Sequence, residues 1–349
     1  MCIIIKKSYL QFFKNLNNIT QHKRKMNQFG TQFRLSIFGE SHGNGVGIIV
    51  DGCPSGIPIS ASDFEMDLSR RRSGAAGTTP RTEKDQIAIM SGIYNDKTTG
   101  APIALFFENS NTKSSDYNRF KTIPRPGHAD FVALNKWSGN NDNRGGGHFS
   151  GRLTLGLVAA GVIAKQIIHP VDITARILEV GGDMDIEASI ARAIASNDSI
   201  GGILECRATT IPIGLGEPFF NSIESLISHL VFSIPAVKAI EFGSGFNAAK
   251  MSGSVHNDPI IAADGTTATN HAGGINGGIS NGNDLVFRIA VKPASSTPAV
   301  QSTYNFGTKR VEEFKVEGRH DLCIALRVPP ILEAVTAIAL ADLWLQKSS

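Results

Sequence analysis

The sequence predicts a single domain of the α+β class, in which helices and antiparallel strands share one core. Three observations support this class. Apolar residues alternate in several short segments and recur at three- and four-residue steps in others, which indicates strands and helices respectively. Short connections join these segments, and no proline- or serine-rich linker divides the chain. The 349 residues are enough to bury a substantial core.

The predicted elements follow one another along the whole chain. The first two strands, residues 33–38 and 46–51, flank a short glycine-rich loop and are therefore expected to pair. Further strands are predicted over residues 86–93, 102–108, 171–178, 201–211, 237–242 and 285–292. Helices are predicted where apolar side chains recur one turn apart, over residues 62–72, 129–137, 151–168, 222–233 and 330–345. The glycine- and acid-rich link over residues 181–199 is expected to be partly disordered.

The positive net charge of the chain comes from its first 25 residues. That segment holds six lysines and arginines and no acidic residue, and removing it leaves 28 basic against 31 acidic residues. The remainder therefore lacks the overall positive field of a nucleic-acid-binding protein. Residues 1–25 are a poor secretory signal, because basic residues follow the apolar stretches of this segment and no small-residue cleavage site is present. We expect residues 1–25 to be a disordered extension, or the product of a start codon upstream of Met26, and residues 26–349 to form the domain.

Cysteine usage and hydropathy exclude further classes. The four cysteines are scattered, without a C-x-x-C pair or a histidine at ligand spacing, which argues against a zinc site or a disulfide framework. No apolar run approaches the ~20 residues needed to cross a bilayer. We therefore expect a cytoplasmic protein without a metal ion, a membrane anchor or a nucleic-acid partner.

The stretch from Arg125 to Ile168 is the strongest candidate for a site. Three successive glycines, residues 145–147, precede a predicted helix that Ser150 is placed to cap. A loop rich in N–H groups before a helix favours anions, and Arg125, Arg144 and Arg152 add forked cationic donors. The alternative is a loop that merely starts a core helix with arginines on its rim. The glycines alone favour that alternative, whereas the added arginines and histidines favour a site.

Other loops carry histidine, arginine or aspartate beside glycine. The known phosphate-loop, dinucleotide, zinc-protease and serine-hydrolase motifs are all missing. Each of these loops has a structural explanation when taken alone, such as arginines that complement a helix dipole. The clusters are Ser41-His42, Arg70–Arg72, Arg125 with His128, Arg144, Asn270-His271, Lys292–Ser296 and Gly318–Asp321.

Together these segments resemble the chorismate synthase family, in order and over nearly the whole chain after residue 26. The early motifs are Phe38-Gly-Glu-Ser-His-Gly43, Arg70-Arg-Arg72, Thr98-Thr-Gly100, Arg125-Pro-Gly-His-Ala-Asp130 and Arg144-Gly-Gly-Gly147. The later ones are Asp198-Ser-Ile-Gly201, Gly214-Leu-Gly-Glu-Pro218, Ala236-Val-Lys238, Asn270-His-Ala-Gly-Gly274, Lys292-Pro293 and Gly318-Arg-His-Asp321.

The resemblance implies a reaction and a cofactor. The family is a carbon–oxygen lyase of the shikimate pathway of aromatic amino acid biosynthesis. It converts 5-enolpyruvylshikimate 3-phosphate to chorismate and phosphate by 1,4-trans elimination, and it requires reduced FMN although the reaction has no net redox change. In the family's usual account reduced flavin lends electron density as phosphate leaves. Since no separate nicotinamide-binding domain is evident in the sequence, an external flavin reductant is expected, with NADPH as the candidate donor.

Residue roles are carried over by motif. His42 is implied to protonate the departing phosphate, His128 to maintain the protonation state of the reduced flavin, and Asp321 to serve as the route for the substrate proton. The expected substrate or NADPH phosphate ligands are Arg70, Arg71, Arg72, Arg125 and Arg144. The expected FMN-binding residues are Ser150, Ala236, Gly277, Lys292, Pro293, Ala294, Ser295, Ser296 and Arg319.

The resemblance also implies an architecture, a single-domain β-α-β sandwich of two four-stranded antiparallel sheets that enclose helices, assembled as a homotetramer. The sequence departs from the family pattern at His148-Phe149, where many members have Arg-Ser. It also lacks an arginine often found near Ala75–Gly77.

Two other functions would use the same features. A non-catalytic phosphometabolite-binding protein would bind the substrate tightly without releasing phosphate. An RNA-binding protein would bind through residues 1–25 in a salt-dependent manner, but the negative remainder and the few aromatic residues disfavour it.

Overall fold

Two antiparallel sheets form the outer layers of the domain. The computed structural model describes residues 27–80, 83–110, 115–318 and 320–347, so the expected extension over residues 1–25 and Arg319 lie outside the described residues. The first sheet has the order β1 (Gln28–Phe29), β2 (Arg34–Gly39), β3 (Gly45–Asp51), β7 (Ile103–Glu108) and β4 (Ile87–Ser91). The second has the order β10 (Val237–Phe242), β13 (Leu285–Val291), β9 (Gly202–Thr209) and β8 (Asp172–Val180).

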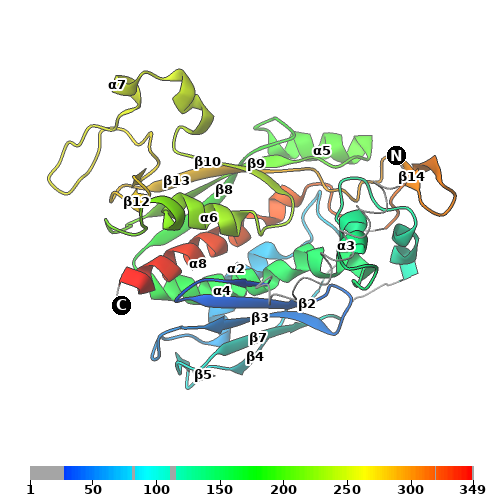
Figure 1. Ribbon diagram of the computed structural model, residues 1–349, viewed down its shortest axis with the longest axis horizontal. Helices are drawn as coiled ribbons and strands as arrows, with labels where there is room; N and C mark the ends of the chain where they lie inside the picture. Colours follow the sequence, from blue (N-terminus) through cyan, green and yellow to red (C-terminus); the bar gives the residue numbers. More distant parts are fainter. Residues whose placement is uncertain (1–26, 81–82, 111–114, 319, 348–349) are drawn as a thin grey trace, which may run out of the picture.

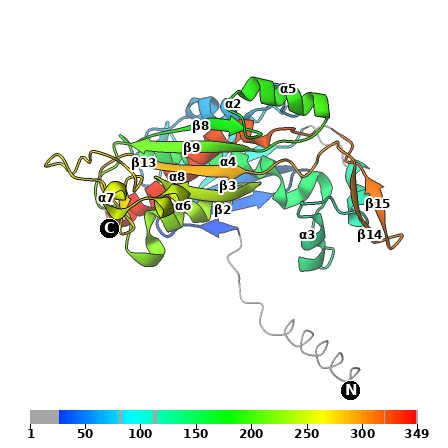
Figure 2. The same ribbon diagram turned by 90° about the horizontal axis from the view of Figure 1, so that it is seen from above.

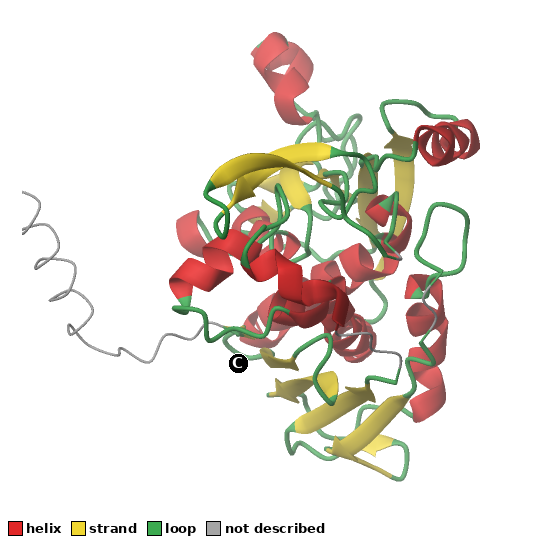
Figure 3. Cartoon of the chain, turned by 90° about the vertical axis from the view of Figure 1, so that its right-hand side faces the viewer, coloured by secondary structure: helices red, strands yellow, loops and turns green. Residues whose placement is uncertain are grey.

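The helical layer lies between these sheets, as Figure 1 and Figure 3 show. It consists mainly of α2 (Glu65–Arg71), α4 (Thr154–Ile167) and α8 (Pro329–Lys347), with α6 (Ile223–Val231) packed against α8 and β10. Helix α4 contacts β3 of the first sheet and α8, while α8 contacts β8 of the second. The expected α+β class and the sandwich of two antiparallel sheets around helices are therefore confirmed. One sheet has five strands because the two-residue β1 pairs with β2.

Alternation of apolar side chains explains why the second sheet packs on this layer. Along β13, Leu285, Phe287, Ile289 and Val291 are buried, and the residues between them are only partly covered. Successive side chains of a strand point to opposite faces, so one face of β13 joins the core. Burial of each such side chain stabilises the fold by roughly 1.5–3 kcal/mol.

Two glycines allow α4 to approach its neighbours on both sides. A Cβ on Gly161 would lie 2.3 Å from the Cβ of Ala334 in α8. A Cβ on Gly156 would lie 3.0 Å from the Cβ of Ile48 in β3. Glycine costs roughly 1 kcal/mol relative to alanine inside a helix, so its presence at residue 161 is explained by the close contact of the two helices.

A buried carboxylate ties the two ends of the domain together. Asp342 of α8 accepts hydrogen bonds from the backbone N–H groups of Thr31, Gln32 and Phe33 at 3.0, 2.7 and 2.8 Å. These groups form the turn before β2, and Asp342 is 2% exposed. The last helix therefore holds the first long strand in place.

The main predicted strands and helices are confirmed, with end positions that differ by a few residues. The prediction of a partly disordered link over residues 181–199 is wrong, because α5 (Ile186–Ser196) forms there beside β8, as Figure 2 shows. Asp185 caps α5 by accepting a hydrogen bond from the N–H of Ala188 at 3.0 Å, and Asn197 ends it in the left-handed conformation. These two capping residues are the local signal that the glycine- and acid-rich composition obscured.

Several short elements were not predicted. The largest is the hairpin of β14 (Gln301–Asn305) and β15 (Arg310–Phe314), and two-residue pairs join β5 (Ile93–Tyr94) to β6 (Lys97–Thr98) and β11 (Ile275–Asn276) to β12 (Ile279–Ser280). Helix α7 (Gly253–His256) was not predicted either, whereas α3 (Asp130–Lys136) matches the helix predicted over residues 129–137. Within the described residues, no helix combines the length and the apolar character that crossing a bilayer requires.

We predict that Gly161→Ala lowers the free energy of unfolding by about 1–3 kcal/mol, because the overlap with Ala334 outweighs the better helix propensity of alanine. Thermal unfolding followed by circular dichroism measures this effect. Gly253→Ala is the matched control, since a Cβ there meets nothing within 4 Å. Equal midpoints for the two variants would contradict the packing argument.

Candidate functional site

A cavity of about 500 Å³ collects side chains from loops that are distant in the sequence. Its walls come from the end of α2, the loop before β4, the Arg125–Ala129 turn, the glycine turn before α4, residues 234–236, Lys292 with residues 294–296, and the segment from His320 to α8. This volume lies within the range of small-molecule sites.

The glycine turn shapes one wall. Gly145, Gly146 and Gly147 have φ values of 60°, 83° and 54°, in the left-handed region that side chains disfavour. A Cβ on Gly145 would lie 2.5 Å from Nε2 of His42, so the imidazole packs directly behind this glycine. His42 is buried and also contacts the ring of Tyr117 edge-on, with 5.1 Å between the ring centroids. After the turn, the hydroxyl of Ser150 accepts a hydrogen bond from the N–H of Arg152 at 3.3 Å.

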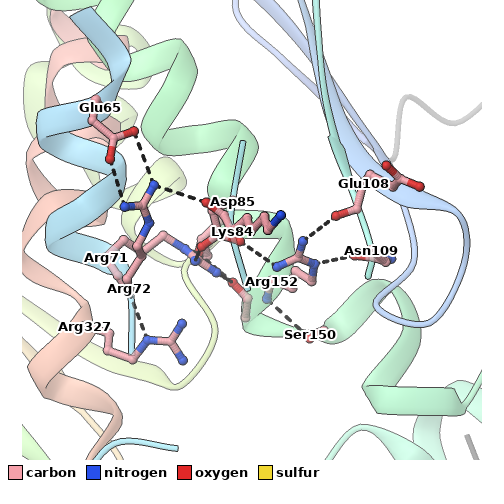
Figure 4. A network of polar contacts seen from close by, with 12 residues as sticks. Glu65, Arg71, Arg72, Lys84, Asp85, Glu108, Asn109, Ser150, Arg152 and Arg327 are labelled. Carbon is pink, nitrogen blue, oxygen red and sulfur yellow. Dashed lines mark hydrogen bonds and ion pairs between the residues drawn. The ribbon is translucent and has the colours of Figure 1, made fainter. Parts of the chain in front are cut away.

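Two buried arginines share one carboxylate at the base of the cavity, as Figure 4 shows. Nη1 of Arg71 lies 3.3 Å from Oδ2 of Asp85, and Nη1 of Arg152 lies 2.8 Å from Oδ1 of the same residue. Burial, followed by the positive charge of Arg327, lowers the pKa of Arg71 to about 9. Arg71 therefore remains cationic at neutral pH.

A third arginine links this pair to Asp321. Nη1 of Arg327 lies 3.2 Å from Oδ2 of Asp321, and its Nε–H donates to the carbonyl oxygen of Arg71 at 3.0 Å. The backbone N–H of Thr79 donates to Oδ1 of Asp321 at 2.9 Å. The Asp321 carboxylate is thus held in a fixed orientation on the cavity wall.

Arg72 contributes an unsatisfied donor. Its guanidinium pairs with Glu65 at 2.8 Å and donates to the carbonyl oxygen of Lys84 at 3.1 Å. Its Nε is buried and finds no hydrogen-bond partner within the part of the chain that the structure describes. Such a donor is an exception, because buried donors are rarely left unpaired.

Asp130 organises the opposite wall. It accepts hydrogen bonds from Nε and Nη2 of Arg125, both at 2.8 Å, and lies 2.7 Å from Nδ1 of His128. Burial raises the pKa of Asp130, but the hydrogen bonds from Arg125 and His128 outweigh burial and lower it. Arg125 also lies over the ring of Phe120 at 4.4 Å, a cation–π contact.

The carboxylate of Asp130 also determines the tautomer of His128. Burial lowers the pKa of His128, so the ring is neutral at neutral pH. A neutral ring carries one proton, and the carboxylate of Asp130 at 2.7 Å favours that proton on Nδ1. Nη2 of Arg125 lies 3.1 Å from the same nitrogen but donates to Asp130 at the shorter distance of 2.8 Å. Nε2 therefore carries the lone pair, on the side of the glycine turn near Gly146.

The segment Lys292–Ser296 closes the cavity beside His128. Nζ of Lys292 donates to Oγ of Ser295 at 2.6 Å, and this hydroxyl donates to the carbonyl oxygen of Gly127 at 2.8 Å. Nη1 of Arg125 donates to Oγ of Ser296 at 2.9 Å. The two loops are therefore held together by side-chain hydrogen bonds.

Positive charge predominates in the cavity. Its lining includes five arginines and one lysine against three carboxylates: Arg71, Arg72, Arg125, Arg152, Arg327 and Lys292, with Glu83, Asp85 and Asp321. Forked guanidinium donors in a partly desolvated site bind carboxylate and phosphate groups strongly. The arrangement suits a small ligand that carries several negative charges.

Most predicted site residues meet at this cavity. Those that line it are His128, Asp321, Ser150, Ala236, Lys292, Ala294, Ser295, Ser296, Arg71, Arg72 and Arg125. His42 lies behind Gly145, adjacent to the cavity. Pro293 and Gly277 are not part of its lining. Gly277 lies in the turn between β11 and β12.

Two predicted ligands have other partners. Arg70 turns toward α8, where its Nη2 lies 2.6 Å from Oε1 of the buried Glu333. Arg144 pairs with its neighbour Asp142 at 2.7 Å. Neither arginine is part of the cavity lining.

Several lining residues were not assigned from the sequence. From the sequence, Arg152 is predicted only to add positive charge near the site. No role as a ligand or catalytic group is predicted for Asp85, Tyr117, His320 or Arg327. Local signals for them are weak: Asp85 precedes an ordinary strand, and Arg327 precedes the proline pair that starts α8. They reach the cavity only through tertiary structure. At the departure from the family pattern, Phe149 lines the cavity, whereas Nδ1 of His148 lies 2.9 Å from the carbonyl oxygen of Gly39.

We predict that the protein loses stability as the pH falls below about 6.5. Burial lowers the pKa of both His128 and His320, so below the ordinary histidine pKa the unfolded chain binds more protons than the folded one. Thermal midpoints measured between about pH 7.5 and 5.5 should decline, and a His128→Gln/His320→Gln variant should flatten this decline. An identical slope in that variant would show that the two rings titrate alike in both states.

Comparisons with known proteins agree with this geometry. A family model described as chorismate synthase matches residues 33–345. A chorismate synthase of Chitinophaga pinensis is 62% identical over 321 residues, covering 92% of this chain and 97% of the relative. One of Korarchaeum cryptofilum is 43% identical over 346 residues, covering 90% and 96%. A solved structure entitled "Crystal Structure of Chorismate Synthase" superposes with a TM-score of 0.71 at 25% identity, covering 91% of this chain and 93% of that one. The chain belongs to the chorismate synthase family.

Proposed function

We propose that the cavity described above is where this chain converts 5-enolpyruvylshikimate 3-phosphate to chorismate and phosphate. Family membership supports the reaction itself, a 1,4-trans elimination in the shikimate pathway. The observation that carries the site assignment is the convergence of five arginines, Lys292, His128 and Asp321 on one cavity, with His42 directly behind its glycine wall. The substrate carries a phosphate and two carboxylates, and guanidinium pairs bind such groups bidentately.

The family requires reduced flavin, and the wall formed by Ala236 and residues 292–296 fits a flavin mononucleotide. Side chains there are small, apart from Lys292, and Gly127 beside them presents no Cβ. Lys292 supplies a positive charge suited to the cofactor's phosphate or to its reduced ring. When bound, reduced flavin supplies electron density that assists departure of the substrate phosphate. The predicted contacts of Gly277, Pro293 and Arg319 remain part of this proposal.

Three residues have proposed roles in proton movement. His42 protonates the departing phosphate, from its position packed against Gly145 at the edge of the cavity. His128 holds its proton on Nδ1 against Asp130 and presents Nε2 as an acceptor. Asp321, oriented by Thr79 and Arg327, lies on the path by which the substrate proton leaves.

Binding of the substrate anions is assigned to the arginines that line the cavity. We assign this role to Arg71, Arg72 and Arg125, as predicted, and add Arg152 and Arg327. All five arginines line the cavity, which supports their part in anion binding. Arg70 and Arg144 retain at most an indirect role, because carboxylates outside the cavity already hold them.

The source of electrons and the assembly are further parts of the proposal. An external flavin reductant is proposed, as the family resemblance and the sequence suggested. NADPH is the candidate donor, and a homotetramer is the expected assembly.

We predict that the protein, under anaerobic conditions with photoreduced FMN, releases one phosphate for each chorismate formed. Phosphate and chorismate are measured together, with and without NADPH. Turnover that needs photoreduction even when NADPH is present supports the external reductant. Tight substrate binding without phosphate release would instead identify a phosphometabolite-binding protein.

We predict that His42→Ala lowers turnover by roughly two to four orders of magnitude, the range typical for loss of a general acid. His229→Ala is the control, because His229 is exposed on α6 and is not part of the cavity lining. Single-turnover rates with saturating reduced FMN separate this effect from weaker cofactor binding. Unchanged turnover in His42→Ala would remove His42 from the mechanism.

A further inference from the structure

Asp85 is a buried carboxylate that the proposed reaction does not use directly. It stands on the loop before β4 and is 6% exposed. Its φ is 47°, in the left-handed region that aspartate and asparagine adopt more readily than most residues. Both of its oxygens face arginines, Oδ1 toward Arg152 at 2.8 Å and Oδ2 toward Arg71 at 3.3 Å.

The two arginines come from different parts of the chain. Apart from Asp85, the hydrogen-bond acceptors of their guanidinium groups are uncharged. Arg71 ends α2, and its guanidinium also donates to Oγ1 of Thr154 at 2.9 Å and to the carbonyl oxygen of Gly151 at 3.2 Å. Arg152 precedes α4 and also donates to the carbonyl oxygen of Glu108 at 3.0 Å and to the side chain of Asn109. Asp85 is therefore the charged group that joins the two guanidiniums.

The charges at the base of the cavity do not cancel. Arg71, Arg152 and Arg327 bring three positive charges within electrostatic range of one another, and each of the other two lowers the pKa of Arg71. Asp85 and Asp321 offset two of these charges. One positive charge remains for an anionic ligand, while like-charge repulsion would push the guanidiniums apart if Asp85 were neutral.

We propose that Asp85 is a positioning residue for the substrate-binding arginines of this enzyme. Its carboxylate fixes the separation and the direction of Arg71 and Arg152, so that their remaining N–H groups point at a bound phosphate or carboxylate. This inference rests on the proposed function of the cavity. It differs from simple charge compensation, because it requires the carboxylate to stand at one place between the two guanidiniums.

The first test is Asp85→Asn, which keeps the shape and the tolerance of the left-handed backbone. An amide has one acceptor oxygen and one donor nitrogen, so one of the two guanidiniums loses its partner and turns away. We expect KM for 5-enolpyruvylshikimate 3-phosphate to rise about tenfold or more, while kcat changes less than about threefold, because ground-state binding is lost. The dissociation constant of the substrate, measured by calorimetry without flavin, should rise in parallel.

The second test is Asp85→Glu, which keeps the charge but moves it by one methylene. A positioning role predicts a raised KM in this variant too, whereas charge compensation alone predicts the wild-type value. A wild-type KM in Asp85→Glu therefore overturns the proposal, and this variant decides the question even if Asp85→Asn does not fold. Circular dichroism and thermal midpoints establish that each variant is folded.

Two controls separate this inference from others. Asp51→Asn removes a carboxylate from a surface pair with Arg34, outside the cavity, and should leave KM unchanged. In an Arg152→Gln background, Asp85→Asn should raise KM by much less than in the wild type, because interacting residues are not additive. If Asp85→Asn raises KM by the same factor in the Arg152→Gln background as in the wild type, the proposal is overturned. Wild-type production of chorismate and phosphate tests the proposed function independently of every Asp85 variant.

Discussion

The close packing of α4 between the first sheet and α8 is the constraint on which the rest of the structure depends. Gly156 and Gly161 allow the helix to touch β3 on one side and α8 on the other. Because protein interiors are close-packed, a helix fixed on two sides has little freedom to shift along its axis. The short 3₁₀ turn that leads into it, Gly151–Leu153, therefore brings Ser150 and Arg152 to the cavity in a defined position. The glycine turn just before it brings the backbone up against His42. Core packing and site geometry are thus two consequences of the same contacts.

The second constraint is the cost of burying charge. Guanidinium groups removed from water need carboxylate partners, since an isolated buried charge costs several kcal/mol. The cavity meets this need with few acids: Asp85 serves two arginines, and Asp130 serves Arg125 and His128. Sharing of carboxylates leaves an excess of positive charge, which suits a ligand with several anionic groups. Because each shared carboxylate has two partners, substituting one carboxylate disturbs the positions of two side chains in the cavity.

The predictions from sequence succeeded where the signal was local. Apolar periodicity located the central strands and helices, and α5 was missed because its glycine- and acid-rich surroundings obscured the capping residues Asp185 and Asn197. The site followed the same rule. Arg125 and His128, site residues predicted from one motif, are neighbours in space as well as in sequence, and Asp130 of the same motif, which had no predicted role, pairs with both. Arg70 was grouped with Arg71 and Arg72, yet it pairs with Glu333, which lies 263 positions further along the chain.

What the sequence by itself determined is the α+β class, the family and most of the loops that meet at the cavity. The tertiary structure decided which side chain of each loop faces the cavity. Successive residues of a helix point about 100° apart, so Arg70, Arg71 and Arg72 at the end of α2 necessarily face different surroundings. Each of the three arginines faces the carboxylate that it pairs with: Glu333, Asp85 and Glu65, respectively. No local pattern around the arginines reveals the pairing with Glu333. Electrostatic pairing across long sequence separations is a property of the folded chain, because it depends on distances that only packing creates.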